Sequence, residues 1–240
     1  MRRHTAFPCV LLYLLGTAFP YATHAAGATD VTAQAKVRIA GAKPSEHHNN
    51  EGVVMWLTPV DMPLAPRPGS ASGNRLQLAQ KNKAFVPHLL VVQVGSTVEF
   101  PNLDPFFHNV FSQFNGKRFD LGLYESGSSR SVRFDRPGIS YIFCNIHPEM
   151  SAVVVSVPTP YFAMSTAAGS LTIHDVLPGT YMMHVWAMGN SDSDLASSGR
   201  RISVSGTTID LGTIALQESM PGPHKNKFGE DYDVKKPSSY

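Results

Sequence analysis

The chain has 240 residues, of which 42% are apolar and 16% are charged, and its formal net charge is +2. This apolar content is enough for a packed core and excludes an intrinsically disordered chain. The low charge, together with 19 glycines and 18 prolines, excludes long charged helices and favours an all-β fold of short strands joined by turns.

The first 25 residues predict a cleaved signal peptide. Arg2 and Arg3 give a positive start, and an apolar run follows over residues 6–19. This run is too short and too interrupted to span a bilayer, which takes about 18 or more apolar residues. We therefore expect a periplasmic or secreted protein with no membrane span in the mature chain. Removing this segment takes away two basic residues and balances the charges, so nucleic acid is not an expected partner.

Little regular structure is predicted between the signal peptide and residue 79. Residues 26–36 are small and polar and predict a flexible leader. The N-terminal region 37–60 contains two predicted strands, Val37–Ile39 and Val53–Leu57. Prolines and glycines over residues 61–79 predict a linker.

Residues 80–158 predict a compact set of short strands. Apolar runs and stretches that alternate between apolar and polar residues are separated by Gly, Pro and Asn turns. The predicted strands are Leu89–Val94, Thr97–Phe100, His108–Ser112, Ser129–Phe134, Tyr141–Cys144 and Ala152–Val157. Several short strands at this spacing indicate a β-sandwich or barrel.

A single cysteine remains once the signal peptide is removed. Cys9 lies within that peptide, which leaves Cys144 without a partner thiol. Cysteines of exported proteins normally form disulfides, so an unpaired one is either an inert buried thiol or a functional group. The neighbours of Cys144 favour a function.

The loop from Cys144 to Met150 contains a thiolate, an imidazole and a thioether within seven residues, with His147 between the two sulfur ligands. A tight loop between two strands folds back on itself, so these side chains can converge. His108 begins another strand and would join them if the two strands lie side by side. Two His, one Cys and a weak Met form the ligand set of a blue-copper electron-transfer centre.

Other interpretations of these residues are less specific. Met150 alone would be core filling, and a lone histidine such as His108 is usually a surface residue. Zinc is the main competing metal, but structural zinc sites use cysteines and histidines and no thioether. A second cysteine in the loop, or paired His-x-His motifs, would indicate a multi-copper site, and the sequence has neither.

The segment His108-Asn109-Val110, followed by Cys-x2-His-x2-Met between two strands, resembles the cupredoxin family over residues 80–158. The short Cys-to-Met loop is similar to that of amicyanins. The resemblance implies a Greek-key β-sandwich that binds one copper ion through four ligands, His108, Cys144, His147 and Met150.

The resemblance also implies roles for residues around the metal. Asn109 would form a hydrogen bond across the site and pin the ligand loop. The ring edge of His147 would face redox partner proteins. Apolar cover for the metal is expected from Phe106, Phe107 and Phe111.

The C-terminal third predicts a second β-sandwich. Residues 169–173 and 175–181, the latter with a Pro-Gly turn, resemble the carboxypeptidase regulatory-like (transthyretin-like) fold over residues 161–216. Such domains typically have no catalytic site. We hypothesise that the N-terminal strands complete this sandwich and that the copper domain is inserted into it. Residues 217–240 are polar and predict a disordered tail.

These expectations together describe a type 1 copper protein that carries single electrons between redox partners and is not an enzyme. Copper sequestration or delivery through the same ligands is the alternative. A structural or carbohydrate-binding module with a degenerate metal motif is a third hypothesis.

Overall fold

The computed structural model describes residues 27–39, 50–63, 76–113, 116–188, 199–218 and 224–232. Over these residues the chain contains sixteen strands and no helix, which confirms the all-β fold class. The predicted signal peptide and residues 64–75 of the predicted linker lie outside the described part. No helix within the described part is long and apolar enough to cross a membrane.

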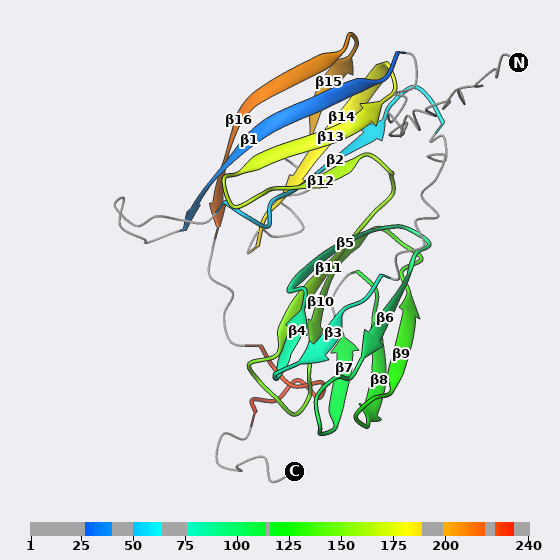
Figure 1. Ribbon diagram of the computed structural model, residues 1–240, viewed down its shortest axis with the longest axis vertical. Helices are drawn as coiled ribbons and strands as arrows, with labels where there is room; N and C mark the ends of the chain where they lie inside the picture. The colour runs from blue at the N-terminus through cyan, green and yellow to red at the C-terminus, as the bar shows by residue number, and fades with distance from the viewer. Residues whose placement is uncertain are drawn as a thin grey trace, which may run out of the picture.

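Seven strands form an upper lobe of two facing sheets (Figure 1). A three-stranded sheet has the order β13 (Ser170–Val176), β1 (Thr29–Ile39), β16 (Thr208–Glu218), and a four-stranded sheet has the order β12 (Phe162–Met164), β2 (Val54–Pro59), β14 (Gly179–Trp186), β15 (Arg200–Val204). Alternate apolar side chains of both sheets point inward and form one buried core. The N-terminal strands β1 and β2 thus pair with strands from the C-terminal third, the pairing that our insertion hypothesis requires.

The predicted flexible leader over residues 26–36 is wrong, because β1 begins at Thr29 rather than at residue 37. Val31, Ala33, Ala35 and Val37 alternate with more exposed residues and face the upper core. Alanine is a small and weakly apolar residue, which hid this two-residue period. Pairing with β13 on one side and β16 on the other stabilises the strand despite its low β-propensity.

Nine strands form a lower lobe, shown in green in Figure 1. One sheet has the order β5 (Leu89–Gln93), β11 (Ser151–Val157), β10 (Gly138–Phe143), β7 (His108–Ser112), β8 (Phe119–Tyr124). Two further ribbons pair β6 (Thr97–Pro101) with β9 (Ser129–Arg133), and β3 (Ala79–Lys81) with β4 (Ala84–Val86). Buried side chains from these sheets, including Phe100, Val132 and Ile142, form the lower core.

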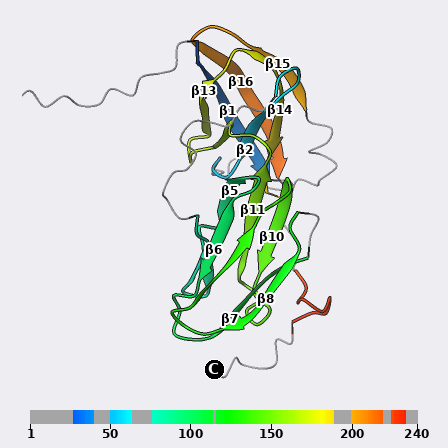
Figure 2. The same cartoon turned by 90° about the vertical axis from the view of Figure 1, so that its right-hand side faces the viewer.

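The two lobes share a third apolar cluster. Along β11, Ala152 and Val154 face the lower core, whereas Val153 and Val155 face the upper lobe. Trp186 at the end of β14 is fully buried in this contact. Both views place β11 next to the upper lobe (Figure 1 and Figure 2). A strand buried on both faces explains the continuous apolar run of its sequence.

Part of the predicted disordered tail is ordered. β16 continues to Glu218, and residues 224–232, the C-terminal segment, lie against the far end of the lower lobe, where Figure 1 shows them in red. Hydrogen bonds and ring stacking, rather than burial of apolar side chains, hold this segment in place. A polar composition therefore did not indicate that the segment is ordered. Residues 219–223 and 233–240 lie outside the described part.

Candidate metal centre

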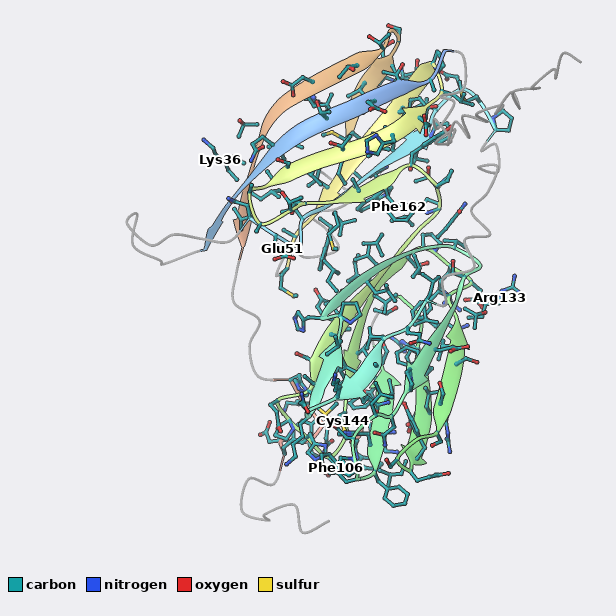
Figure 3. All side chains as sticks on the ribbon, in the orientation of Figure 1. Lys36, Glu51, Phe106, Arg133, Cys144 and Phe162 are labelled. Atoms are coloured by element: carbon teal, nitrogen blue, oxygen red, sulfur yellow. The ribbon has the colours of Figure 1, made fainter. Side chains whose placement is uncertain are left out.

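The strands of the lower lobe bring the predicted ligand residues to one end of the five-stranded sheet. His108 begins β7, and Cys144 directly follows β10. The two strands are antiparallel neighbours, with Phe143 paired to Phe111. The start of β7 and the end of β10 therefore meet. Figure 3 shows Cys144 at this end, next to the labelled Phe106.

Three metal-ligating atoms converge there. The Cys144 sulfur lies 3.8 Å from His108 Nδ1 and 3.6 Å from His147 Nδ1, and the two imidazole nitrogens are 3.1 Å apart. His108 and Cys144 are fully buried, and His147 is 5% exposed. Within the described part of the chain, this is the group of three or more His, Cys, Asp or Glu residues that could hold a metal ion.

The separations of these atoms fit one metal ion. Bonds of about 2.0–2.1 Å to imidazole nitrogen and about 2.3 Å to thiolate, at angles near 110–120°, place neighbouring donor atoms roughly 3.3–3.8 Å apart. The two sulfur-to-nitrogen separations of 3.8 and 3.6 Å fall within that spacing, and the nitrogen-to-nitrogen separation of 3.1 Å is slightly shorter. Two ring nitrogens that face each other at 3.1 Å cannot both offer a lone pair unless a cation or a proton lies between them. The donor set therefore suits a bound cation.

Met150 closes the ligand loop. Its amide donates to the His147 carbonyl at 3.1 Å, and its carbonyl accepts from the Cys144 amide at 3.3 Å. These bonds fold the seven-residue loop into a tight turn between β10 and β11. The Met150 side chain is fully buried and belongs to the same apolar cluster as Cys144.

A buried carboxylate orients His108 from behind. Asp104 Oδ2 lies 2.8 Å from His108 Nε2, which leaves Nδ1 free to face the other ligands. The same carboxylate accepts the backbone amides of Asn82 at 2.6 Å and Lys83 at 2.9 Å. Those two residues have positive φ angles in the tight turn between β3 and β4. Asp104 thus connects that hairpin to the His108 imidazole.

The pKa of the Asp104 carboxyl stays below its ordinary value. Burial on its own would raise this pKa, but the hydrogen bonds from Lys83, His108 and Asn82 outweigh the desolvation. The carboxylate is therefore ionised at neutral pH. An ionised carboxylate that contacts one ring nitrogen fixes the tautomer and the orientation of the imidazole, so that the other ring nitrogen is presented to a metal.

Burial also shifts the pKa values of Cys144 and His147, the other two groups that would bind a metal. It raises the pKa of the Cys144 thiol, although the backbone amides of Asn109, Ile146 and His147 favour the thiolate. It lowers the pKa of His147, and the neighbouring His108 adds to this effect. A neutral imidazole is the form that binds metal, and a bound cation would supply the charge that stabilises the thiolate.

The predicted aromatic cover is only partly present. The Phe106 ring lies 5.1 Å from the His108 ring and 5.7 Å from the His147 ring, measured between centroids. Phe107 is 51% exposed, and Phe111 packs on Phe143 at 5.9 Å. Phe106 alone of the three contacts the ligand imidazoles.

The side chain of Asn109 has a partner that the sequence did not predict. Its Nδ2 donates to Asp120 Oδ1 on β8 at 2.7 Å, on the outer face of the sheet, rather than to the ligand loop. The side chains of neighbouring strand residues point to opposite faces, so Asn109 points away from the side that His108 faces. Its backbone amide, however, faces the Cys144 sulfur. Residues that contact the ligand loop from outside belong to the C-terminal segment, which sequence analysis missed.

Asp104 was also missed by sequence analysis. It lies four residues before His108 in an Asn/Asp-rich loop, and a carboxylate at this short distance from an expected ligand was the available signal. The three converging residues themselves were all named from the sequence. The remaining histidines of the described part do not join this group.

No protein-family model and no curated protein matches this chain. Among solved structures, the chain is similar to a purple cupredoxin from Nitrosopumilus maritimus, with 24% identity, a TM-score of 0.31, and coverage of 34% of this chain and 99% of that one. It is similar to amicyanin at 22% identity and a TM-score of 0.33, over 37% of this chain and 87% of that one. A copper-containing nitrite reductase from Thermus scotoductus SA-01 matches at 20% identity and a TM-score of 0.34, over 50% of this chain and 28% of that one. Because each likeness is weak, the chemistry of the site rests on its own geometry.

Proposed function

We propose that this protein is an exported type 1 copper protein that carries single electrons between redox partner proteins. The convergence of two imidazoles and one thiolate in a buried site, beside a buried Met150, carries the proposal. Thiolate and thioether favour Cu(I), and imidazole binds both Cu(I) and Cu(II). Bound copper would supply a one-electron couple.

The chain's own residues supply the rest of the proposed chemistry. His108, Cys144 and His147 would hold the ion, and Met150 would be the weak fourth ligand. Asp104 fixes the His108 ring, and Phe106 and the lower core keep water away from the ligands. A site whose ligands are held by packing and hydrogen bonds rearranges little when an electron arrives, which favours fast transfer. No substrate bond is made or broken in this function.

The expected contact between His147 and redox partners differs from the structure. His147 was expected to present its ring edge to partners, but it is only 5% exposed. Partners would therefore approach the small exposed edge of His147 beside Phe106. This burial also favours electron transfer over copper delivery, because delivery needs the ligands to open and exchange.

The resemblance of residues 161–216 to carboxypeptidase regulatory-like domains stays a prediction. In this proposal the upper lobe is a module without chemistry of its own. The predicted signal peptide supports export, and the absence of a second cysteine from the ligand loop supports one copper ion per chain.

Copper titration of the purified protein tests the proposal. We expect one Cu(II) per chain and an intense visible absorption band from charge transfer between thiolate and copper. The Cys144→Ser variant should lose the band, whereas Met150→Leu should keep it and change the reduction potential, since the axial ligand tunes that potential.

Three outcomes would contradict the proposal. A Cu(II) complex without the intense visible band would exclude a type 1 site. Stoichiometric zinc binding with a strong preference over copper would assign the three residues to a zinc site. Rapid loss of copper to a chelator, on the timescale of mixing, would assign the protein to copper delivery.

A further inference from the structure

The C-terminal segment (residues 224–232) contacts the ligand loop at three points. Tyr232 donates its hydroxyl to the Cys144 carbonyl at 2.7 Å, and the Lys227 amide donates to Asn145 Oδ1 at 2.9 Å. His224 Nε2 lies 2.6 Å from the Pro148 carbonyl oxygen. These contacts lie on both sides of His147 in the sequence.

Ring stacking anchors the segment to the sheet beside the loop. The His224 ring stacks on Phe143, the last residue of β10, with centroids 4.0 Å apart and planes 24° apart. The Tyr232 ring meets the His224 ring edge-on at 5.2 Å. Ile139 and Tyr141 on the same strand pack in the cluster shared with the upper lobe, so the segment continues the cover of one sheet face.

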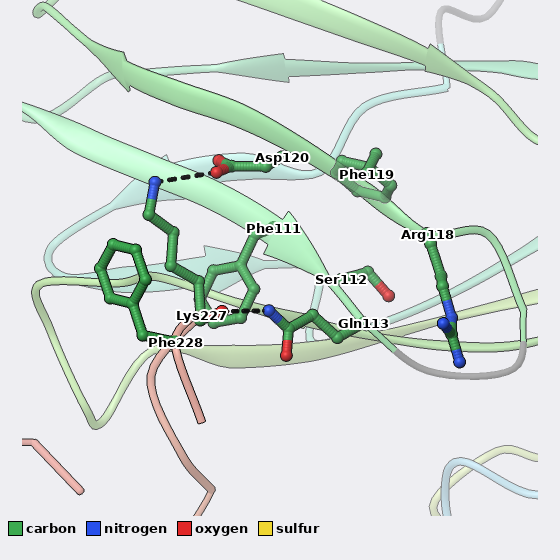
Figure 4. Close-up of a pocket in the computed structure, with 8 residues that line it drawn as sticks. All are labelled: Phe111, Ser112, Gln113, Arg118, Phe119, Asp120, Lys227 and Phe228. Carbon is green, nitrogen blue, oxygen red and sulfur yellow. Dashed lines mark hydrogen bonds and ion pairs between the residues drawn. The ribbon is translucent and has the colours of Figure 1, made fainter. Parts of the chain in front are cut away.

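A salt bridge connects the segment to the strand that follows β7. Lys227 Nζ lies 2.8 Å from Asp120 Oδ2, and Gln113 donates to the Lys227 carbonyl (Figure 4). Asp120 also accepts the hydrogen bond of Asn109, the residue after the ligand His108. The segment therefore stacks on β10, which ends just before Cys144, and reaches β7 through Asp120 and Asn109.

We propose that the C-terminal segment is a positioning element of the metal centre, which holds the loop from Cys144 to Met150 in its ligating shape. The ligand loop is held from outside by hydrogen bonds from Tyr232, His224 and the Lys227 backbone. This is the role that was expected of Asn109. Two hydrogen bonds within the loop, between Cys144 and Met150 and between Met150 and His147, are supplemented by three from the segment. The expected effect on copper binding rests on the proposed function, whereas the expected effect on the shape of the loop does not.

The reactivity of the buried thiol in metal-free protein measures the loop directly. Cys144 is fully buried, so a thiol reagent reaches it only when the loop opens. Removing one hydrogen bond makes such opening about 2- to 10-fold more frequent. We therefore expect Tyr232→Phe to increase the labelling rate within this range, and the double variant His224→Phe with Tyr232→Phe to increase it further.

The same variants are then loaded with copper. We expect faster copper loss to a chelator by a similar factor, together with a shift of the charge-transfer band, which a general loss of stability would not produce. His224→Phe keeps a ring on Phe143 and removes the hydrogen bond to Pro148, whereas His224→Ala removes both. The Ala variant should therefore have the larger effect.

Arg136→Ala is the matched control, because the Arg136 side chain lies in the turn between β9 and β10, pairs with Asp135 and is 63% exposed. It should leave the labelling rate and the absorption band unchanged. Labelling rates of Tyr232→Phe and the double variant that equal those of wild type would overturn the inference. If wild-type protein binds no copper but the labelling rates rise as expected, the positioning role stands and the proposed function fails.

Discussion

The lower lobe meets its surroundings in two ways that differ in chemistry. Towards the upper lobe, β11 and β10 present aliphatic side chains to Trp186 and Val54, all of them buried. At the opposite end, the contacts of Asp104, His108 and the C-terminal segment are hydrogen bonds, an ion pair and stacked rings. The apolar contact contributes mainly stability, whereas the polar end fixes the directions of individual side chains.

Replacing Trp186 in the apolar contact should have the largest effect on stability. Trp186→Ala leaves a large cavity between the lobes and should lower the free energy of unfolding by about 3–5 kcal/mol. Trp186 Nε1 has no hydrogen-bond partner within the described residues, so Trp186→Phe removes an unpaired donor and should cost less. Denaturant unfolding measures both losses.

The same two variants test the separation of the two ends. The visible spectrum of the copper-loaded Trp186 variants should match that of wild type. A shifted charge-transfer band would show that the apolar contact also shapes the metal centre, and the contrast between the ends would fail.

Replacing Asp104 should have an intermediate effect, confined to the polar end. Asp104→Ala removes the partner of His108 Nε2 and the acceptor of two turn amides. Loss of such a partner typically lowers metal affinity by about 10- to 100-fold. Asp104→Asn keeps an acceptor oxygen and should cost less. Competition titration with a chelator measures the affinities.

Asp135→Asn is the control for the two Asp104 variants. Asp135 is half-exposed and pairs with Lys117 at 2.8 Å. Its loss should leave metal affinity unchanged. An Asp104→Ala variant with wild-type affinity would mean that packing alone orients His108.

The salt bridge between Lys227 and Asp120 should have the smallest effect, visible mainly in acid. Burial would raise the pKa of Asp120, but the hydrogen bonds from Lys227, Gly122 and Asn109 outweigh it and lower this pKa. A depressed carboxyl pKa contributes stability that is present above the unfolded pKa near 3.8 and is lost as the pH falls through the folded value. Both side chains are partly exposed, so we expect about 0.5 kcal/mol.

Unfolding measurements from about pH 6 down to about pH 2 check this expectation, because the lowered pKa of Asp120 places its titration below that of an ordinary carboxyl. Wild type should lose more stability than Lys227→Met below a pH of about 4, because the variant has already lost the ion pair. Equal losses in the two proteins would indicate that the pair contributes nothing in solution.

The apolar features of the molecule were the more predictable from sequence. Alternation and apolar runs placed β5, β6, β7, β10 and β11, and residue types named His108, Cys144 and His147 as a cluster. β1 was missed over Thr29–Lys36 because alanines weaken its period. Local sequence patterns indicate which side chains are buried, and the burial of alternate side chains determines which segments form core strands.

The polar contacts could not be predicted from the sequence alone. Asp104 and His224 become informative only once the chain brings them to His108 and Phe143. A carboxylate or an imidazole in a polar stretch looks the same in sequence whether it faces solvent or a ligand. The order of the C-terminal segment depends on partners between 76 and 114 residues distant in sequence, which no local pattern encodes.

The parallel pairing of β1 with β16 has a consequence for the order in which the chain can fold. Asp30 pairs with Thr208 and Ile39 with Glu218, so the upper lobe cannot close before residue 218 has left the ribosome. Strands β3 to β11, by contrast, occupy one uninterrupted stretch from Ala79 to Val157. We therefore expect the lower lobe to fold early, before the N-terminal and C-terminal strands of the upper lobe pair.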